Sequence, residues 1–281
     1  MKFTKLQGAG NDFIVTNGFE EKPKNWNWVA QKVCNRNFGI GADGFIFCSE
    51  SDIADVKMNF YNSDGSRAEM CGNGIRCFAK FVYDNKIVRK KDMAIETDAG
   101  IKVVKITCND RGQVESLSVD MDRVNFDAKS VPCTLKEEQV LNETFFVDGS
   151  EFKISSVLMG VPHAVIFVDN YEDFDLNKIG KMIEHHPIFP KKTNVNFVKK
   201  LSDDTLQIKT WERGAGRTLG CGTGSSASAA VAHKLGIINS DEVKVLNDGG
   251  ELIIKIGKDY SIEMSGRANT ICTGEYIIEN L

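Results

Sequence analysis

Two stretches of sequence decide how this chain is expected to fold: YNSDGSRAEMCGNG at residues 61–74 and WERGAGRTLGCGTG at residues 211–224. With the second placed under the first at an offset of 150 (221 − 71), an aromatic residue, an arginine, a cysteine and two glycines coincide. A repeat of this kind is typical of a duplicated structural unit. We therefore expect two halves, each built around a Cys-Gly-x-Gly motif, at Cys71 and at Cys221.

Shorter matches follow in the same order along the chain. Leu6-Gln7-Gly8 aligns with 158–160 at an offset of 152 (158 − 6), and Phe45-Ile46 aligns with 197–198 at the same offset. In this register Asn11 lies over His163. The 281 residues are enough for two domains, and we expect the boundary between them near residues 122–126.

The local patterns predict strands and one principal helix in each half. After the first motif, apolar residues follow helical spacing at Ile75, Phe78, Ala79 and Val82. After the second, the small residues 225–232 predict a closely enclosed helix that ends at Gly236 as its cap. Strands are predicted at 103–106, 116–119 and 252–256. The expected fold class is therefore a mixed α/β (α+β) architecture of two pseudo-symmetric domains, each a strand-rich sheet around a central helix.

Composition excludes several classes of protein. The net charge is −4 and Lys and Arg are not clustered, which argues against nucleic acid as a partner. No apolar run is long enough for a membrane helix, and the first residues lack the apolar core of a signal peptide. The eight cysteines are therefore expected as thiols in the cytoplasm. Neither they nor the four histidines have zinc-site spacing, so no metal is expected.

The Cys-Gly-x-Gly motif places a thiol where a helix begins. N–H groups at a helix start can bind an anion, here those of Gly72, Asn73, Gly222 and Thr223. The helix dipole also favours the thiolate. Two such thiols could invert an α-carbon: one removes the proton from one face, and the other returns a proton to the opposite face. Taken singly, each motif also fits a packed cysteine, a phosphate site or a plain turn.

Seven blocks of sequence resemble the diaminopimelate epimerase family, over essentially the whole chain. They are 8–13 (GAGNDF), 62–66 (NSDGS), 71–77 (CGNGIRC), 160–163 (GVPH), 193–197 (TNVNF), 212–214 (ERG) and 221–224 (CGTG). The resemblance implies domains at 1–121 and 122–267, with the site in the cleft between them. It also implies that a final strand within 268–281, at about 270–279, returns to the first domain.

The resemblance further implies the roles of individual residues and the reaction. Cys71 and Cys221 would be the catalytic acid/base pair, with His163 and Glu212 as their polar partners. Asn11 would lie near the reacting amino group, and Asn62, Asn194 and Arg213 would hold the far end of the substrate. The implied reaction interconverts LL- and meso-diaminopimelate for lysine and peptidoglycan synthesis, without a cofactor. A homodimer is the expected assembly.

Four positions depart from the family pattern. Val161 stands where an Asn usually contacts the far end of the substrate, Arg217 where Glu is commoner, and Gly44 where some members have Gln. Arg267 follows Gly266 where the family usually has Pro. The departures at 161 and 217 bear on which substrate is used. A racemase of the same fold acting on another amino acid, such as histidine, is therefore a second hypothesis. A dithiol redox protein and an anion-binding module are hypotheses of other classes.

Overall fold

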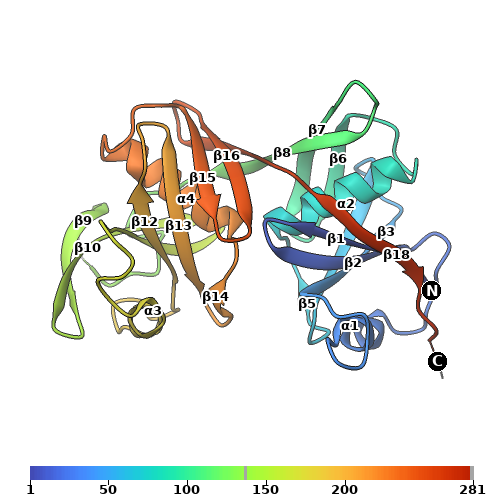
Figure 1. The fold of residues 1–281 in the computed structure, drawn as a ribbon, viewed down its shortest axis with the longest axis horizontal. Coiled ribbons are helices and arrows are strands. Elements are labelled where there is room, and N and C mark those ends of the chain that lie inside the picture. Colours follow the sequence, from blue (N-terminus) through green and yellow to red (C-terminus); the bar gives the residue numbers. More distant parts are fainter. Residues whose placement is uncertain (136–137, 279–281) are drawn as a thin grey trace. The chain divides into compact units, whose positions relative to one another are not determined.

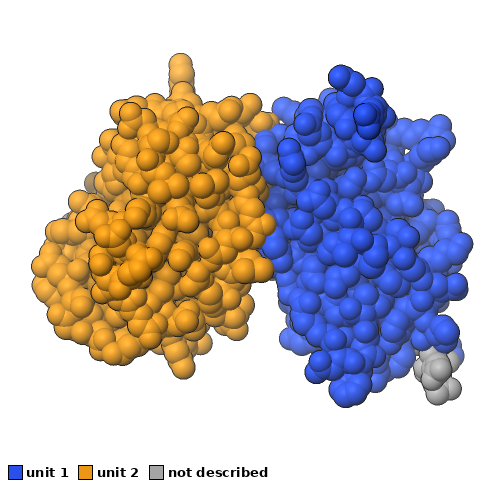
Figure 2. Space-filling model, in the orientation of Figure 1, with its two compact units in different colours: residues 1–120, 265–281 blue, residues 121–264 orange. Residues whose placement is uncertain are grey.

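The computed structural model describes residues 1–135 and 138–278 and divides into two compact units (Figures 1 and 2). Unit 1 comprises residues 1–120 and 265–281, and unit 2 comprises residues 121–264. The chain therefore leaves unit 1 once and re-enters it once. Within the described residues, no helix is both long and apolar enough to cross a membrane.

Unit 1 is a mixed sheet with two helices. Its elements are β1 (Lys2–Gly8), β2 (Asn11–Asn17), α1 (Trp26–Cys34), β3 (Gly44–Ser49), β4 (Val56–Asn62), β5 (Arg67–Ala68), α2 (Gly72–Asp84), β6 (Asp92–Thr97), β7 (Gly100–Cys108), β8 (Val114–Arg123, which runs on into unit 2) and β18 (Asn269–Glu275). Neighbouring strands follow the order β18-β1-β2-β3-β4-β6-β7-β8. The β2–β3 and β4–β6 pairs are parallel and the others antiparallel.

Unit 2 repeats this plan. Its elements are β9 (Val140–Val147), β10 (Ser150–Met159), β11 (Val161–Phe167), α3 (Leu176–Glu184), β12 (Asn194–Lys200), β13 (Thr205–Glu212), β14 (Gly216–Thr218), α4 (Gly222–Lys234), β15 (Glu242–Asn247), β16 (Gly250–Ile256) and β17 (Ser261–Gly266, which ends in unit 1). The strand order is β9-β10-β11-β12-β13-β15-β16, with β11–β12 and β13–β15 parallel. The expected mixed, strand-rich fold of two like units is confirmed.

The two central helices, α2 and α4, are enclosed in different ways. Helix α2 buries large side chains such as Ile75 and Phe78, both fully buried. Helix α4 buries only small ones over most of its length, including Ala229 and Ala232 at 0% exposure. Its end differs by one residue from the expectation: Leu235 is the cap, and Gly236 follows it with φ +67°. Glycine suits this position because a left-handed backbone carries no steric penalty there.

The last strand is shorter than the sequence suggested. We expected it to extend to residue 279, but β18 ends at Glu275. The reason is its partner: Glu275 pairs with Lys2, the first residue of β1, so the ladder has no further strand to follow. Tyr276 N still donates to Met1 O at 2.8 Å. Glu279 itself lies outside the described residues.

Candidate active site

The first cysteine motif in unit 1 caps helix α2. Cys71 is the N-cap residue with extended backbone (φ −140°, ψ 124°), and its Sγ accepts a hydrogen bond from Gly74 N at 3.4 Å. The helix therefore begins with Gly72 and Asn73, whose N–H groups occupy the positions that a helix does not pair internally. The thiol lies at the positive end of the helix dipole, as expected.

The second cysteine motif in unit 2 has the same geometry. Cys221 is the N-cap of α4 (φ −120°, ψ 112°), and its Sγ accepts from Gly224 N at 3.3 Å. Thr223 Oγ1 lies 3.4 Å from the same sulfur. Cys221 is 5% exposed and Cys71 is half-buried. The two motifs thus hold a thiol in the same backbone arrangement.

In unit 1, a chain of side-chain amides orients Asn11. Asn73 Nδ2 donates to Asn11 Oδ1 at 2.6 Å, and Asn11 Nδ2 donates to Asp43 Oδ2 at 3.1 Å. Asn73 Oδ1 in turn accepts from Arg76 Nη2 at 2.7 Å, while Arg36 Nη2 donates to Asp43 Oδ1 at 2.8 Å. With a cation at one end and a carboxylate near the other, neither amide can rotate without losing bonds. The sequence did not single out Arg76 or Asp43.

In unit 2, Asn196 orients the buried ring of His163. Asn196 Nδ2 lies 3.1 Å from His163 Nδ1 and 3.2 Å from Ala164 O, and its Oδ1 accepts from Thr210 Oγ1 at 3.1 Å. An amide N–H facing Nδ1 places the ring proton on Nε2. Burial, with a further contribution from the charge of Arg213, lowers the pKa of His163 to about 3. The ring is therefore neutral at physiological pH.

Gly44 in unit 1 corresponds to Asn196 in unit 2, because the two positions differ by the repeat offset of 152 (196 − 44). A Cβ on Gly44 would lie only 2.6 Å from Phe60 Cε2 and 3.0 Å from Tyr61 O. The position of Phe60 corresponds to that of Thr210, 150 residues on (210 − 60). A large aromatic ring beside glycine has thus been exchanged for two small polar side chains. This packing explains why Gln cannot stand at position 44 without a shift of Phe60.

Arg213 lies on an exposed turn that several contacts fix. Its backbone N donates to Asn194 Oδ1 at 2.7 Å, and its Nη1 donates to Lys191 O at 3.1 Å. Buried Glu184 at the end of α3 accepts from Trp211 Nε1 at 2.8 Å and from Gly214 N at 3.1 Å. Burial raises the pKa of Glu184, but the bonds from Trp211 and Gly214 lower it below its ordinary value overall. Glu184 is a residue that the sequence did not reveal.

Two other predicted residues lie at strand ends. Glu212 is the last residue of β13, directly before Arg213. Asn62 is the last residue of β4 and is exposed. Its Nδ2 donates to Ser66 Oγ at 3.0 Å, within the turn between β4 and β5. This bond stabilises the turn, so Asn62 has a structural role of its own.

The departure at Arg217 has a structural explanation. Arg217 Nη2 lies 2.5 Å from Asp248 Oδ2, and Arg67 in unit 1 pairs with Asp98, with Nη2 to Oδ1 at 2.8 Å. The two arginines are 150 residues apart (217 − 67), and so are the two aspartates (248 − 98). The ion pair thus belongs to the duplicated framework, where it ties one hairpin to the next. Val161, the other departure, is the half-buried first residue of β11.

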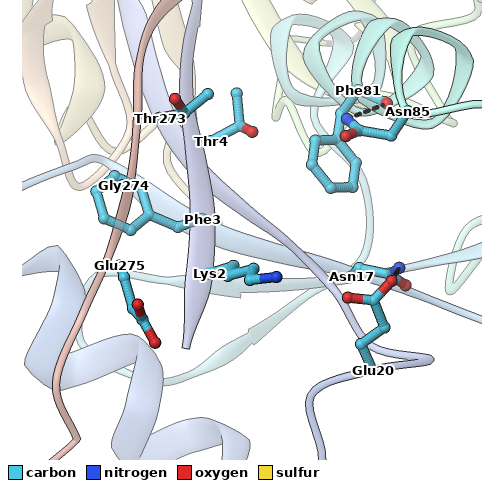
Figure 3. A pocket seen from close by; sticks show the side chains of 10 residues that line it. All are labelled: Lys2, Phe3, Thr4, Asn17, Glu20, Phe81, Asn85, Thr273, Gly274 and Glu275. Carbon is cyan, nitrogen blue, oxygen red and sulfur yellow. Dashed lines mark hydrogen bonds between the residues drawn. The ribbon is translucent and has the colours of Figure 1, made fainter.

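A pocket of about 480 Å³ in unit 1 contains none of these residues. Its lining comes from β1, β2, β18 and the C-terminal end of α2, where Figure 3 shows Phe81 and Asn85. Cys71 caps the other end of that helix, which spans roughly 20 Å at 1.5 Å per residue. The pocket therefore does not belong to the cysteine site. Among residues 1–135 and 138–278, no cluster of His, Cys, Asp and Glu has the arrangement of a metal site.

Comparison with known proteins gives a consistent result. The sequence profile of the family described as Diaminopimelate epimerase matches residues 3–126 and 155–271. A diaminopimelate epimerase of Alkaliphilus metalliredigens is 43% identical over 279 residues, covering 99% of this chain and 98% of its own length. Another, of Methanococcus maripaludis, is 44% identical over 277 residues, covering 98% and 99%.

Solved structures share the fold at low sequence identity. A phenazine biosynthesis protein of Bacillus anthracis superimposes with a TM-score of 0.71 at 14% identity, covering 99% of both chains. A probable proline racemase of Agrobacterium radiobacter gives a TM-score of 0.71 at 16% identity, covering 99% of this chain and 93% of its own. At such identities the match concerns the fold alone.

Proposed function

The chain belongs to the diaminopimelate epimerase family, and from this premise we propose that it interconverts LL- and meso-diaminopimelate through Cys71 and Cys221. One observation carries the proposal: the duplicated motif places each cysteine at the N-cap of a central helix, with Sγ 3.4 Å from Gly74 N and 3.3 Å from Gly224 N. Inversion at carbon needs a proton-transfer group for each face, and the duplication supplies two of one kind.

In the proposed reaction one cysteine begins as a thiolate and the other as a thiol. The thiolate takes the α-proton, and the electron pair of the broken C–H bond remains on the carbon as a carbanion. The thiol then gives its proton to the opposite face and becomes a thiolate. The two sulfurs have exchanged protonation states and the configuration is inverted. For this, Cys71 and Cys221 must reach opposite faces of one carbon; the interdomain cleft implied by the resemblance stays a prediction.

The N-termini of α2 and α4 would stabilise the negative charge that develops on the substrate. As the carbanion forms, charge moves onto the α-carboxylate, and donors fixed beforehand stabilise it without rearrangement. We propose the N–H groups of Gly72 and Asn73 on α2, and of Gly222 and Thr223 on α4, as these donors. Asn11 would accept from or donate to the reacting amino group, because its amide is already oriented by Asn73.

The polar partners of the thiols are assigned to unit 2. His163 is held by Asn196 and is neutral, so its Nε2–H can donate but the ring carries no charge. Among the described residues, no hydrogen-bond partner meets Nε2. A buried donor in this condition calls for a partner, which the bound substrate or a thiolate would supply. Glu212, at the end of β13, would be the second polar partner.

The far end of the substrate would be held by Arg213, with Asn62 and Asn194. A guanidinium binds a carboxylate through two parallel bonds, and the Arg213 turn is fixed by Asn194 and Glu184. Because Arg217 is paired with Asp248, its charge is already balanced within the framework. Val161 offers no amide, which removes one polar contact at most.

The remaining expectations follow from the proposed chemistry. The domains would be 1–121 and 122–267 with a final strand from 268, each domain supplying one cysteine. The protein would work in the cytoplasm, since both thiols must stay reduced, and would serve lysine and peptidoglycan synthesis without a cofactor. A homodimer is proposed, and light scattering of the purified protein would test it.

The decisive experiment is incubation with LL-diaminopimelate in D2O. We expect deuterium to appear at the α-carbon, as measured by NMR, and the meso isomer to form, as measured by chiral chromatography. Histidine and other amino acids with one carboxylate are run in parallel. Faster turnover of one of these would replace the substrate but keep the racemase chemistry. Absence of α-hydrogen exchange with every amino acid would favour a redox or anion-binding role instead.

A further inference from the structure

Asp43 ends the loop between α1 and β3 and contacts Asn11 of the candidate site. Its Oδ2 accepts hydrogen bonds from Asn11 Nδ2 at 3.1 Å and from Asp12 N at 3.2 Å. Its Oδ1 accepts from Arg36 Nη2 at 2.8 Å. Each of these three neighbours is a donor, so both carboxylate oxygens of Asp43 serve as acceptors.

A second carboxylate, that of Asp12, lies beside the first on the neighbouring strand β2. Asp43 N donates to Asp12 Oδ1 at 3.0 Å, and Arg36 reaches the same carboxylate with Nη1 at 3.2 Å and Nη2 at 2.8 Å. Lys5 Nζ lies 3.0 Å from Asp12 Oδ2 and donates to Gly41 O at 2.6 Å. Burial acts to raise the pKa of Asp12, but the bonds from Arg36 and Lys5 lower it below its ordinary value overall. Two cations thus hold two neighbouring anions in place.

Unit 2 shows that the fold does not require these charges. At the repeat offset of 152, Asp12 corresponds to Ala164 and Asp43 to Val195 (164 − 12 and 195 − 43). Ala164 and Val195 are partners in the parallel pair β11–β12, and both are 0% exposed. Two small apolar side chains are therefore sufficient for this strand pairing. Like charges placed side by side disfavour each other, so the carboxylates of unit 1 call for a reason other than the fold.

The reason lies in the amide of Asn11, which has two orientations related by exchange of its nitrogen and oxygen. A carboxylate accepts hydrogen bonds and has none to give, so Asp43 requires the nitrogen of Asn11 to face it. On the other side, Asn73 Nδ2 donates to Asn11 Oδ1 at 2.6 Å. Rotation of Asn11 would set its oxygen against the carboxylate and its NH2 group against that of Asn73. Asn11 is therefore held with its oxygen towards the first turn of α2.

We infer that Asp43, held by Arg36, is a positioning residue for Asn11, which it orients to accept from the amino group of the substrate. The inference rests on the proposed function, in which Asn11 lies near that group; Asp43 acts through Asn11. Replacement of Asp43 by Asn breaks the arrangement, because a carboxamide has one acceptor oxygen where the site uses two. With that oxygen on Arg36, the new NH2 group faces Asn11 Nδ2, and Asn11 must rotate or move.

The test is a double-mutant cycle of Asp43→Asn and Asn11→Ala, measured by steady-state kinetics with diaminopimelate. We expect Asp43→Asn alone to lower kcat/KM about tenfold, mainly through KM, as for loss of a hydrogen bond to a charged group that is used throughout the reaction. In the Asn11→Ala background the same change should cost less than about twofold, because the residue through which Asp43 acts is gone. A loss below about twofold in the parent background overturns the inference. So do equal losses in both backgrounds, which report a direct effect of the Asp43 charge on the substrate.

A second measurement uses no substrate. The side-chain amide signals of Asn11 are followed by NMR in isotope-labelled protein and are assigned by their loss in Asn11→Ala. We expect these signals to shift in Asp43→Asn, and unmoved signals overturn the inference. The matched control is Asp55→Asn: Asp55 also accepts from a cation and a backbone N–H, namely Lys90 Nζ at 2.6 Å and Ala94 N at 2.9 Å. Asp55→Asn should leave the Asn11 signals in place and kcat/KM within about twofold.

Arg36→Ala keeps the inference testable if Asp43→Asn does not fold. The Arg36 side chain is 58% exposed, so its removal leaves the core intact, but Asp43 Oδ1 loses its donor. We expect a loss of about threefold in kcat/KM that disappears in the Asn11→Ala background. A loss that persists there overturns the inference. The exchange assay on the parent protein decides the proposed function independently, so failure of the function and failure of the inference are told apart.

Discussion

In unit 1 the first turn of α2 rests on Arg76, and the residue beside it, Asn11, is an amide. In unit 2 the first turn of α4 rests on Ser226, and the residue that corresponds to Asn11 is His163. The backbone around the two thiols is nearly the same. Duplication has therefore kept the geometry and changed the charges. A reaction that starts from either isomer needs equal placement of the two thiols, whereas the side chains behind the first helical turns differ.

The largest effect should come from removing either thiol. We predict that Cys71→Ala and Cys221→Ala each lower the inversion rate by about 10³-fold or more, since each removes the only proton-transfer group for one face. Each variant should retain slow α-hydrogen exchange with one isomer, and the isomer should differ between them. Chiral chromatography and NMR in D2O measure both. Cys272→Ala, on exposed β18, is the control. Near-normal inversion in either variant would rule out the two-base scheme.

The next comparison sets Arg213 against Arg217. We predict that Arg213→Ala lowers kcat/KM for diaminopimelate. The loss should correspond to about 2 kcal/mol or more of activation free energy, because the substrate's far carboxylate would lose its partner. Arg217→Ala should leave kcat/KM within about threefold, since it opens only the pair with Asp248. Steady-state kinetics of the two variants decide the matter. Equal losses would mean that Arg217 also contacts substrate.

A third comparison uses pH, through His163 and Asn11. The folded-state pKa of His163 is lowered to about 3, whereas an unfolded histidine titrates near its ordinary value of about 6.5. Between these values the unfolded chain binds one more proton, so stability falls as pH falls. The slope from this residue is about 1.4 kcal/mol per pH unit.

Urea unfolding at pH 7, 6 and 5 measures this slope. His163→Asn should remove the contribution of His163 to this slope. Asn11→Ala, at the corresponding position in unit 1, should change the free energy of unfolding by the same amount at all three pH values and leave the slope unchanged. An identical slope in His163→Asn and the parent would contradict the neutral, buried ring.

The smallest effect concerns the turns that carry Asn62 and Arg213. In unit 2 Glu184 accepts two bonds from the turn, and in unit 1 Gln31 Nε2 donates to Asp64 O at 2.7 Å. We predict that Glu184→Gln destabilises the protein by about 1 kcal/mol, because both donors lose a charged acceptor and one of them then faces the new amide NH2, which cannot accept. It should raise KM less than tenfold at constant kcat. Gln31→Ala is the matched change, and thermal unfolding with steady-state kinetics compares them. A drop in kcat would show that Glu184 acts beyond holding the turn.

The features visible in the sequence were those that repeat. The offset of 150 between Cys71 and Cys221 led to the two like units, and alternating polarity located strands such as β7 and β16, because burial of one face leaves a period of two. The position of both thiols at helix starts followed from strand, glycine turn and helix in succession. These are local consequences of chain geometry.

The residues that were missed act through contacts distant in sequence. Asn196 meets His163 from 33 residues away and Glu184 meets Trp211 from 27. Arg76 lies in a helix where a charged side chain would ordinarily be assigned to the solvent face. Nothing in a single sequence distinguishes these from surface residues. The length of β18 was misjudged for the same reason, since its end is set by where β1 begins.

The return of the chain to unit 1 has a consequence for synthesis on the ribosome. Strand β18 pairs with β1 from Lys2↔Glu275 to Gln7↔Asn269, so unit 1 is complete only after all of unit 2 has been translated. Unit 2 is one continuous segment and carries its whole sheet from β9 to β16. Domains usually fold in the order in which they emerge. Here the later segment can reach its final structure first, while β1 waits with an unpaired edge for its last neighbour.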